Sequence, residues 1–306
     1  MNRAIIICGP TASGKSQFAH VLASKYNGEI VNADSMQIYK QLKIITSSPP
    51  EEQKLELKHH LYNFLDIDKH FSAVDYANMA QVEIENINKK GKIPFVVGGS
   101  GMYIDMLLNG YSTMPSIDVD VRENVRALYQ KLGALQFFQL LKEVDPEVAK
   151  ILNINDKQRV QRAYEVVSQT GKSILYFQSQ GRCMVLENYQ FTILCIIPKR
   201  ELLYEMCNKR FKEFVNNGAI DEAKYILDNY PNLDVSGTKA LGLQELMSYL
   251  KGQITIENAI EIASAKTRQY AKRQCTWFSH QLKEKREISY DNLSQYYKII
   301  DSFIIT

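Results

Sequence analysis

The chain has 306 residues, of which 45% are hydrophobic and 23% are charged, an ordinary composition for a globular protein. Its net charge of +3 is too small to identify a nucleic-acid partner, so only the placement of the basic residues bears on that question. We expect a cytoplasmic protein without a membrane segment, because no apolar run approaches about 18 residues and the five scattered cysteines form no C-x-x-C pair.

A glycine-rich loop near the start of the chain separates a predicted strand from a predicted helix. Residues 9–16, GPTASGKS, match the pattern G-x-x-x-x-G-K-[ST] without a mismatch. The apolar run 4–8 predicts a buried strand, and residues 17–23 predict a helix. Such a loop cradles two linked phosphates with its amides, and the diphosphate group can belong to ATP or to another molecule. The candidate phosphate-binding residues are Gly9, Pro10, Thr11, Ala12, Ser13, Gly14, Lys15, which bridges outer oxygens, and Ser16, which holds Mg²⁺.

Further strands and helices alternate along the chain. The pattern predicts strands over 29–33 and 93–97 and helices over 73–90 and 102–108. This alternation favours a parallel, doubly wound sheet, in which functional groups gather at the carboxyl ends of the strands. Asp34 and Ser100 follow the second and third predicted strands, so we expect both to converge with the phosphate loop.

The pattern breaks near residues 110–120 and is helical from Arg122 to about Gln180, before residues 191–197 predict another buried strand. We therefore expect an α/β protein with a P-loop NTPase-like parallel sheet. Its catalytic core comprises residues 1–114 and 189–306, the latter mostly helical. An all-helical insertion occupies residues 115–188.

Two polar groups beside the loop have alternative interpretations. Asp34 suits a general base or a Mg²⁺ ligand, and equally the N-cap of a helix. The Gly98-Gly99-Ser100-Gly101 loop suits an anion or oxyanion site and equally a tight turn. His59-His60 has no further ligands at a usual metal spacing, which favours a structural role.

Two basic segments are candidates for RNA binding. Arg159 and Arg162 share one helix face, while Gln158 and Gln161 have the same spacing and suit base edges; a solvated face is the alternative. Residues 266–286 carry seven basic residues against one acid, interleaved with aromatics such as Trp277. That pattern suits an RNA backbone with stacked bases, although the aromatics also suit the protein core.

Together these motifs resemble the bacterial tRNA dimethylallyltransferases, the isopentenyl-tRNA transferase family. The matching stretches are GPTASGKS at 9–16, NADSMQIY at 32–39, HHLYNFLDI at 59–67, VGGSGMY at 97–103, NDKQRVQRAYEV at 155–166 and KTRQYAKRQCTWF at 266–278. They occur in the family order and spacing and cover nearly the whole chain.

The resemblance implies transfer of a dimethylallyl group from dimethylallyl diphosphate to the exocyclic amine of the adenosine 3′ of the tRNA anticodon. It implies Mg²⁺ as cofactor, no consumption of ATP, the tRNA anticodon stem-loop as partner, and, we expect, a monomer. Catalytic roles then fall to Asp34, which deprotonates the amine, Ser100 and Lys15, with Arg210 on the diphosphate. Positions implied to contact tRNA are Asp34, Ser35, Met36, Gln37, Ser100, Arg122, Gln158, Arg159, Val160, Gln161, Arg162, Lys266 and Arg273.

The chain departs from the family pattern in three places. Residues 41–50 read QLKIITSSPP where relatives have a glycine-bearing, lysine-bearing run, Met206 stands where arginine is common, and Leu243-Gln244 replace a Tyr-Lys/Arg pair. The alternatives to tRNA prenylation are a small-molecule or nucleoside kinase, a prenyltransferase acting on free adenine nucleotides, and a non-enzymatic RNA-binding module. No acidic pair follows an apolar strand after the phosphate loop, which argues against an ATP-hydrolysing motor.

Overall fold

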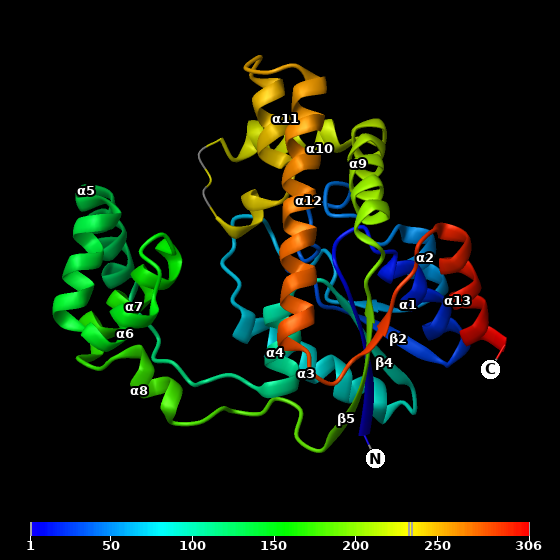
Figure 1. The fold of residues 1–306 in the computed structure, drawn as a ribbon, viewed down its shortest axis with the longest axis horizontal. Helices are drawn as coiled ribbons and strands as arrows, with labels where there is room; N and C mark the ends of the chain where they lie inside the picture. Colours follow the sequence, from blue (N-terminus) through cyan, green and yellow to red (C-terminus); the bar gives the residue numbers. More distant parts are fainter. Residues whose placement is uncertain (1, 232, 234, 306) are drawn as a thin grey trace. The chain divides into compact units, whose positions relative to one another are not determined.

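A computed structural model describes residues 2–231, 233 and 235–305, which form two compact units (Figure 1). The larger comprises Met1–Leu108 and Val185–Thr306, and the smaller comprises Asn109–Met184. The smaller unit begins and ends a few residues before the 115–188 segment expected from the sequence.

The larger unit is built on a parallel sheet, which confirms the expected P-loop NTPase-like α/β core. The strands are β1 (Asn2–Cys8), β2 (Gly28–Asn32), β3 (His59–His60), β4 (Ile93–Gly98), β5 (Tyr189–Ile196) and β6 (Arg286–Ile288). Their order is β3-β2-β4-β1-β5-β6, and every pairing is parallel. The four inner strands were predicted as buried apolar runs. The two edge strands are too short to produce such a signal.

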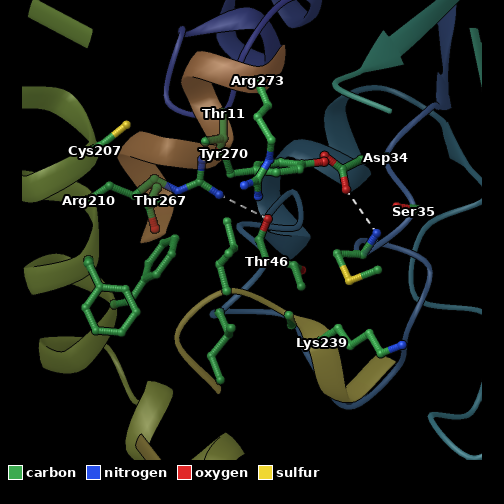
Figure 2. Close-up of a pocket in the computed structure, with 16 residues that line it drawn as sticks. Thr11, Asp34, Ser35, Thr46, Cys207, Arg210, Lys239, Thr267, Tyr270 and Arg273 are labelled. Carbon is green, nitrogen blue, oxygen red and sulfur yellow. Dashed lines mark hydrogen bonds between the residues drawn. The ribbon is translucent and has the colours of Figure 1, made fainter. Parts of the chain in front are cut away.

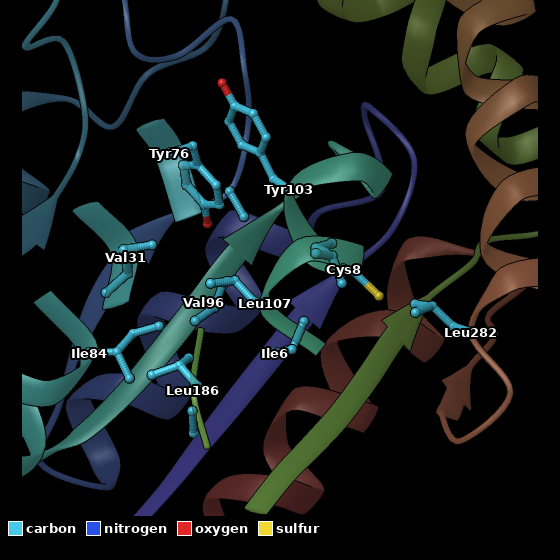
Figure 3. Packing of buried hydrophobic residues seen from close by; sticks show 14 of the residues in the cluster. Ile6, Cys8, Val31, Tyr76, Ile84, Val96, Tyr103, Leu107, Leu186 and Leu282 are labelled. Carbon is cyan, nitrogen blue, oxygen red and sulfur yellow. The ribbon is translucent and has the colours of Figure 1, made fainter. Parts of the chain in front are cut away.

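Helices cover both faces of this sheet, because neighbouring strand residues point to opposite faces. The helices packed on the sheet are α1 (Lys15–Lys25), α3 (Ala73–Lys89), α4 (Gly101–Asn109) and α13 (Leu293–Ile305), whereas the short α2 (Glu51–Glu56) buries no residue. Ile6 and Val96 pack with α3 and α4 (Figure 3), whereas Ile7 and Phe95 pack with α1 and α13. This two-sided burial fixes the loop between β1 and α1 at the carboxyl edge of the sheet.

A second group of helices extends from the sheet: α9 (Arg200–Asn216), α10 (Ala219–Asn229), the 3-10 helix Ser236–Lys239, α11 (Leu243–Leu250) and α12 (Ile256–Gln281). The long α12 packs on α9 and α11 (Figure 1, orange). Its buried face includes Ala263, which joins the core of these helices, and Phe278, which joins the core under the sheet. α12 therefore connects the core of this second group of helices with the core beneath the sheet.

The smaller unit is helical, as predicted for residues 122–180. It contains α5 (Val119–Val144), α6 (Pro146–Ile151), α7 (Lys157–Thr170) and α8 (Ile174–Ser179). Phe137, Leu141 and Val160 lie in its own apolar core. Its two ends are joined by backbone hydrogen bonds between Tyr111 and Cys183. Among the described residues of either unit, no helix is long and apolar enough to cross a membrane.

Candidate functional site

The phosphate loop bends sharply into α1 and carries a buried lysine. Gly14 has a φ of 73°, a left-handed conformation that favours glycine, and precedes the first turn of α1. The Lys15 ammonium donates to the carbonyl of Pro10 at 3.4 Å, and only 8% of the residue is exposed. Burial lowers the pKa of Lys15 to about 8, while the charge of Asp34 opposes that shift. The charge of such a buried cation is screened less by water, so it attracts an anion more strongly than an exposed lysine does.

Two of the cavities beside this loop share Arg210 of α9. One, of about 620 Å³, is lined by the loop from Ala12 to Ser16 and by α9. The other, of about 250 Å³, is lined by Thr11, Asp34 and residues of α12 (Figure 2). Arg210 and Phe214 line both. The phosphate loop and Asp34 therefore open into neighbouring spaces, as the strand-end argument predicts.

Arg210 lies at the boundary of the two cavities and places a positive charge in both of their walls. Its guanidinium donates to the hydroxyl of Thr11 at 2.6 Å and to the carbonyl of Thr46 at 3.4 Å. Burial lowers the pKa of Arg210, and the charge of Asp34 opposes that shift. Arg210, Lys15 and Asp34 thus form one charged group around the boundary between the cavities.

The Asp34 side chain is held by its own loop. Asn32 Oδ1 accepts from the Asp34 amide at 2.8 Å, and Asp34 Oδ1 accepts from the Met36 amide at 3.0 Å. No helix begins at this position; among the described residues the next one along the chain is α2, so the N-cap interpretation is wrong. The turn instead fixes a carboxylate at the cavity wall (Figure 2).

Ser100 lies behind this turn. Its hydroxyl accepts from the Ser35 amide at 2.8 Å and donates to the Ser35 hydroxyl at 3.1 Å. Packing requires glycine at the adjoining position 98, because a Cβ there would lie 2.1 Å from the backbone of Ala33. The Gly-Gly-Ser-Gly loop therefore supports the Asp34 turn, and Ser100 is not among the residues that line the Asp34 cavity.

Gln274 of α12 ties the two loops together. This buried amide accepts from the Thr11 amide at 2.8 Å and donates to the Gly99 carbonyl at 2.8 Å. Sequence reasoning missed it, although one signal was present. Gln274 occupies the helical spacing of the buried residues Thr267, Ala271 and Phe278, where an unpaired polar group would be costly.

The other predicted contacts near Asp34 and on α12 separate into two groups. Ser35, Met36 and Arg273 line the cavity. Gln37 is buried, and its amide donates to the carbonyls of Thr46 and Ser47, both at 2.9 Å. Lys266 pairs with Glu245 and is not among the lining residues. α12 therefore lines the cavity with one face, which carries Tyr270, and buries Phe278 on another, while its role in RNA binding stays a prediction.

The unusual segment 41–50 is anchored from α10. The Glu222 carboxylate accepts from the amides of Lys43, Ile44 and Ile45 at 2.8, 2.7 and 3.0 Å. This places Ile45 and Thr46 on the cavity wall without the glycines and lysine of the family pattern. Sequence reasoning missed Glu222, because nothing local links it to a loop nearly 180 residues away. Of the other departures, Met206 lines the cavity of the phosphate loop, and Leu243 is buried in the helical core.

In the smaller unit the predicted RNA contacts differ in exposure. Gln158 and Arg159 are exposed in the first turn of α7, and Arg159 Nε lies 3.4 Å from Asp156. Val160 is fully buried in the apolar core, so its side chain has no surface to offer RNA. Arg162 bonds Glu165 and the Pro115 carbonyl. Arg122 Nε and Gln161 Nε2 are buried without a partner among the described residues.

The described residues contain no group of three His, Cys, Asp or Glu side chains that would hold a metal by themselves. His60 is buried between Glu29 and Glu83, both at 2.7 Å, a structural role as predicted. Ser16 is exposed at the cavity of the phosphate loop. This arrangement fits Mg²⁺ bound mainly by phosphate oxygens and water, with one hydroxyl from the protein.

Comparisons with known proteins show which family the chain resembles. A profile of the IPP transferase family matches residues 37–281. The tRNA dimethylallyltransferase of Rickettsia conorii is 44% identical over 95% of this chain and 80% of its own length, and that of Rickettsia felis is 44% identical over 97% and 96%.

Solved structures extend the likeness to the fold. A tRNA isopentenylpyrophosphate transferase from Bacillus halodurans has a TM-score of 0.68 at 30% identity, covering 99% of this chain and 95% of that chain. A eukaryotic dimethylallyltransferase acting on tRNA has a TM-score of 0.80 at 27% identity, covering 97% and 76%. Because the profile spans most of the chain and relatives with 44% identity align along nearly all of it, the chain belongs to the IPP transferase family.

Proposed function

We propose that this protein transfers a dimethylallyl group from dimethylallyl diphosphate to the exocyclic amine of the adenosine 3′ of the tRNA anticodon. The observation that carries the proposal is the pair of adjoining cavities. One contains the buried Lys15 of a phosphate loop, the other contains Asp34, and Arg210 lies at their boundary. We expect the protein to act as a monomer in the cytoplasm, a compartment that suits its five free cysteines.

The chain's own residues account for the reaction. Lys15, Arg210 and the loop amides stabilise the diphosphate as its carbon–oxygen bond breaks. When bound at Ser16, Mg²⁺ supplies further positive charge to the leaving group. Met36, Ile45 and Phe211 give the Asp34 cavity an apolar wall suited to a prenyl chain. The amine attacks the carbon that carried the diphosphate, and Asp34 accepts the proton that the nitrogen loses.

The RNA must present one base to this cavity. A nucleotide in a loop leaves its stack at a cost on the order of a few kcal/mol, so an anticodon loop can present the acceptor base to the cavity. We propose that Tyr270 and Arg273 of α12, which line the cavity, contact that nucleotide, and that the exposed start of α7 contacts the RNA backbone.

The alternatives are not favoured. A nucleoside kinase shares the phosphate loop and the strand-end acid, but the relatives carry the names of tRNA-modifying transferases. A prenyltransferase of free adenine nucleotides would need no RNA-binding surface. Incubation with labelled dimethylallyl diphosphate, ATP, AMP and unmodified tRNA separates these activities. Label in tRNA is expected, whereas phosphate transfer or label in AMP alone would contradict the proposal.

The buried lysine gives a pH dependence of donor use. Because the protonated form of Lys15 binds diphosphate and its pKa is lowered to about 8, kcat/KM for dimethylallyl diphosphate should fall as pH rises through about 8. A Lys15→Arg variant keeps its charge, so its decline should move to higher pH. A pH series from about 6.5 to about 10 at saturating tRNA measures both. A wild-type profile that shows no decline across this range would contradict this role.

The exposed arginine of α7 gives a salt dependence of RNA binding. Arg159→Ala should reduce the slope of log Kd for tRNA against log salt concentration by about 0.7–0.9, the value of one lost phosphate contact. Lys150→Ala is the matched control, because Lys150 is also exposed and pairs with an acid three residues away, Glu147. Equal slopes for Arg159→Ala and the wild type would remove Arg159 from the RNA interface.

A further inference from the structure

Two tyrosines near the end of the chain reach back to the phosphate loop. The Tyr290 hydroxyl donates to the carbonyl of Ser13 at 3.1 Å, and the Tyr296 hydroxyl donates to the carbonyl of Gly14 at 2.7 Å. The sequence separations are 277 and 282 residues. Tyr290 is fully buried and Tyr296 is 2% exposed, with ring centroids 4.9 Å apart. Consecutive carbonyls of the loop thus accept from a buried aromatic pair, and the Gly14 carbonyl also accepts from the Phe18 amide at 3.1 Å.

The geometry of the peptide bond turns this contact into an effect on the site. In a trans peptide, the carbonyl and the following N–H point in opposite directions. The Ser13 carbonyl shares a peptide with the Gly14 N–H, and the Gly14 carbonyl shares one with the Lys15 N–H. Holding both oxygens toward the tyrosines therefore directs both N–H groups away from them.

These two amides belong to the set that a diphosphate would use. Gly14, Lys15 and Ser16 line the cavity of about 620 Å³ at the start of α1, where the helix adds its positive end. Among the described residues, neither the Gly14 nor the Lys15 amide has a hydrogen-bond acceptor. Both N–H groups are therefore available to an anion in that cavity.

The loop and the tyrosines fit each other closely. A Cβ on Gly14 would lie 2.8 Å from the Tyr296 hydroxyl, so only glycine admits this approach. α13, which carries Tyr296, packs against α1 on the same face of the sheet. The family profile ends at residue 281, so this contact lies outside the region that it matches.

We propose that Tyr290 and Tyr296 are positioning residues of the diphosphate site: by holding the Ser13 and Gly14 carbonyls, they aim the Gly14 and Lys15 amides at the diphosphate. This rests on the proposed use of the loop as a diphosphate site. The tyrosines touch no substrate and act through the backbone, so their removal weakens donor binding and leaves tRNA binding intact.

The test removes one hydroxyl at a time while keeping each ring. Tyr290→Phe and Tyr296→Phe should each raise the Kd of inorganic pyrophosphate about 3- to 10-fold, the range for one hydrogen bond. The KM for dimethylallyl diphosphate should rise by a similar factor, with the KM for tRNA unchanged. Tyr297→Phe is the matched control, because Tyr297 is on the same helix and 47% exposed. Calorimetry with pyrophosphate and Mg²⁺, steady-state kinetics and melting temperature are measured on each full-length variant.

The outcomes separate this inference from the proposed function. Variants with a lower melting temperature but unchanged pyrophosphate affinity would overturn the inference and leave the function standing. A wild-type protein that transfers no prenyl group, yet shows the tyrosine effect on pyrophosphate, would overturn the function alone. Wild-type protein that binds no pyrophosphate would overturn both. Should Tyr290→Phe fail to fold, Tyr296→Phe decides the matter by itself.

Discussion

Replacement of Asp34 by asparagine should lower kcat for prenyl transfer to tRNA about 10²- to 10³-fold, in the range of a lost general base. Asparagine keeps the size of the side chain and an oxygen that can accept from the Met36 amide, so the turn should persist. What is lost is a group that can take a proton from the amine. The affinity for tRNA and the KM for the donor should change only a few-fold.

The pH dependence of donor use gives a second measurement, which tests the negative charge of Asp34. Because the charge of Asp34 raises the pKa of Lys15, its removal should move the alkaline decline of donor kcat/KM to lower pH. Asp228→Asn, which removes a carboxylate on α10 away from the cavity, is the control and should change neither quantity. Single-turnover rates with prebound tRNA isolate the chemical step from product release. Near-normal turnover by Asp34→Asn would exclude Asp34 as the base.

The sequence alone predicted the parts of this site that are local. A buried apolar run, a glycine-lysine loop and a helix lie next to one another in the chain, and Asp34 and Ser100 each follow a predicted strand. Parallel strands bring such ends to one edge of a sheet, so the order of strands and helices along the chain is enough to predict that these residues converge.

The contacts that position these parts were not predictable, because they join distant segments. Gln274 bonds Thr11 across 263 residues, and Glu222 bonds the amides of Lys43 to Ile45 across nearly 180. No local motif gives the partner of either residue, although helical spacing places Gln274 among the buried residues of α12. The match to the family motif also misled in one place, since Arg159 is exposed whereas the adjacent Val160 points into the core. A continuous stretch of matching residues on a helix includes residues of its exposed face and of its buried face, so not every residue in the stretch can contact RNA with its side chain.

Lys15→Ala should produce the other large effect, a fall of about 10²-fold or more in kcat/KM for dimethylallyl diphosphate, the size of a lost charge contact to a leaving group. The ammonium is nearly excluded from water, so its attraction to the diphosphate is stronger than that of a surface lysine. The same variant should bind tRNA within about twofold of the wild type, because a single buried charge in the diphosphate cavity contributes little to the salt-dependent RNA affinity.

The matched control is on the same helix. Lys25, in the last turn of α1, is exposed and lies over the Tyr26 ring, so Lys25→Ala removes an equal charge without touching the cavity. Filter binding with tRNA and kinetics with varied donor measure the two effects independently. Equal losses of tRNA affinity and donor use in Lys15→Ala would mean that the phosphate loop serves the RNA as well. That result would contradict the division between a diphosphate cavity and an acceptor cavity, on which the proposed reaction depends.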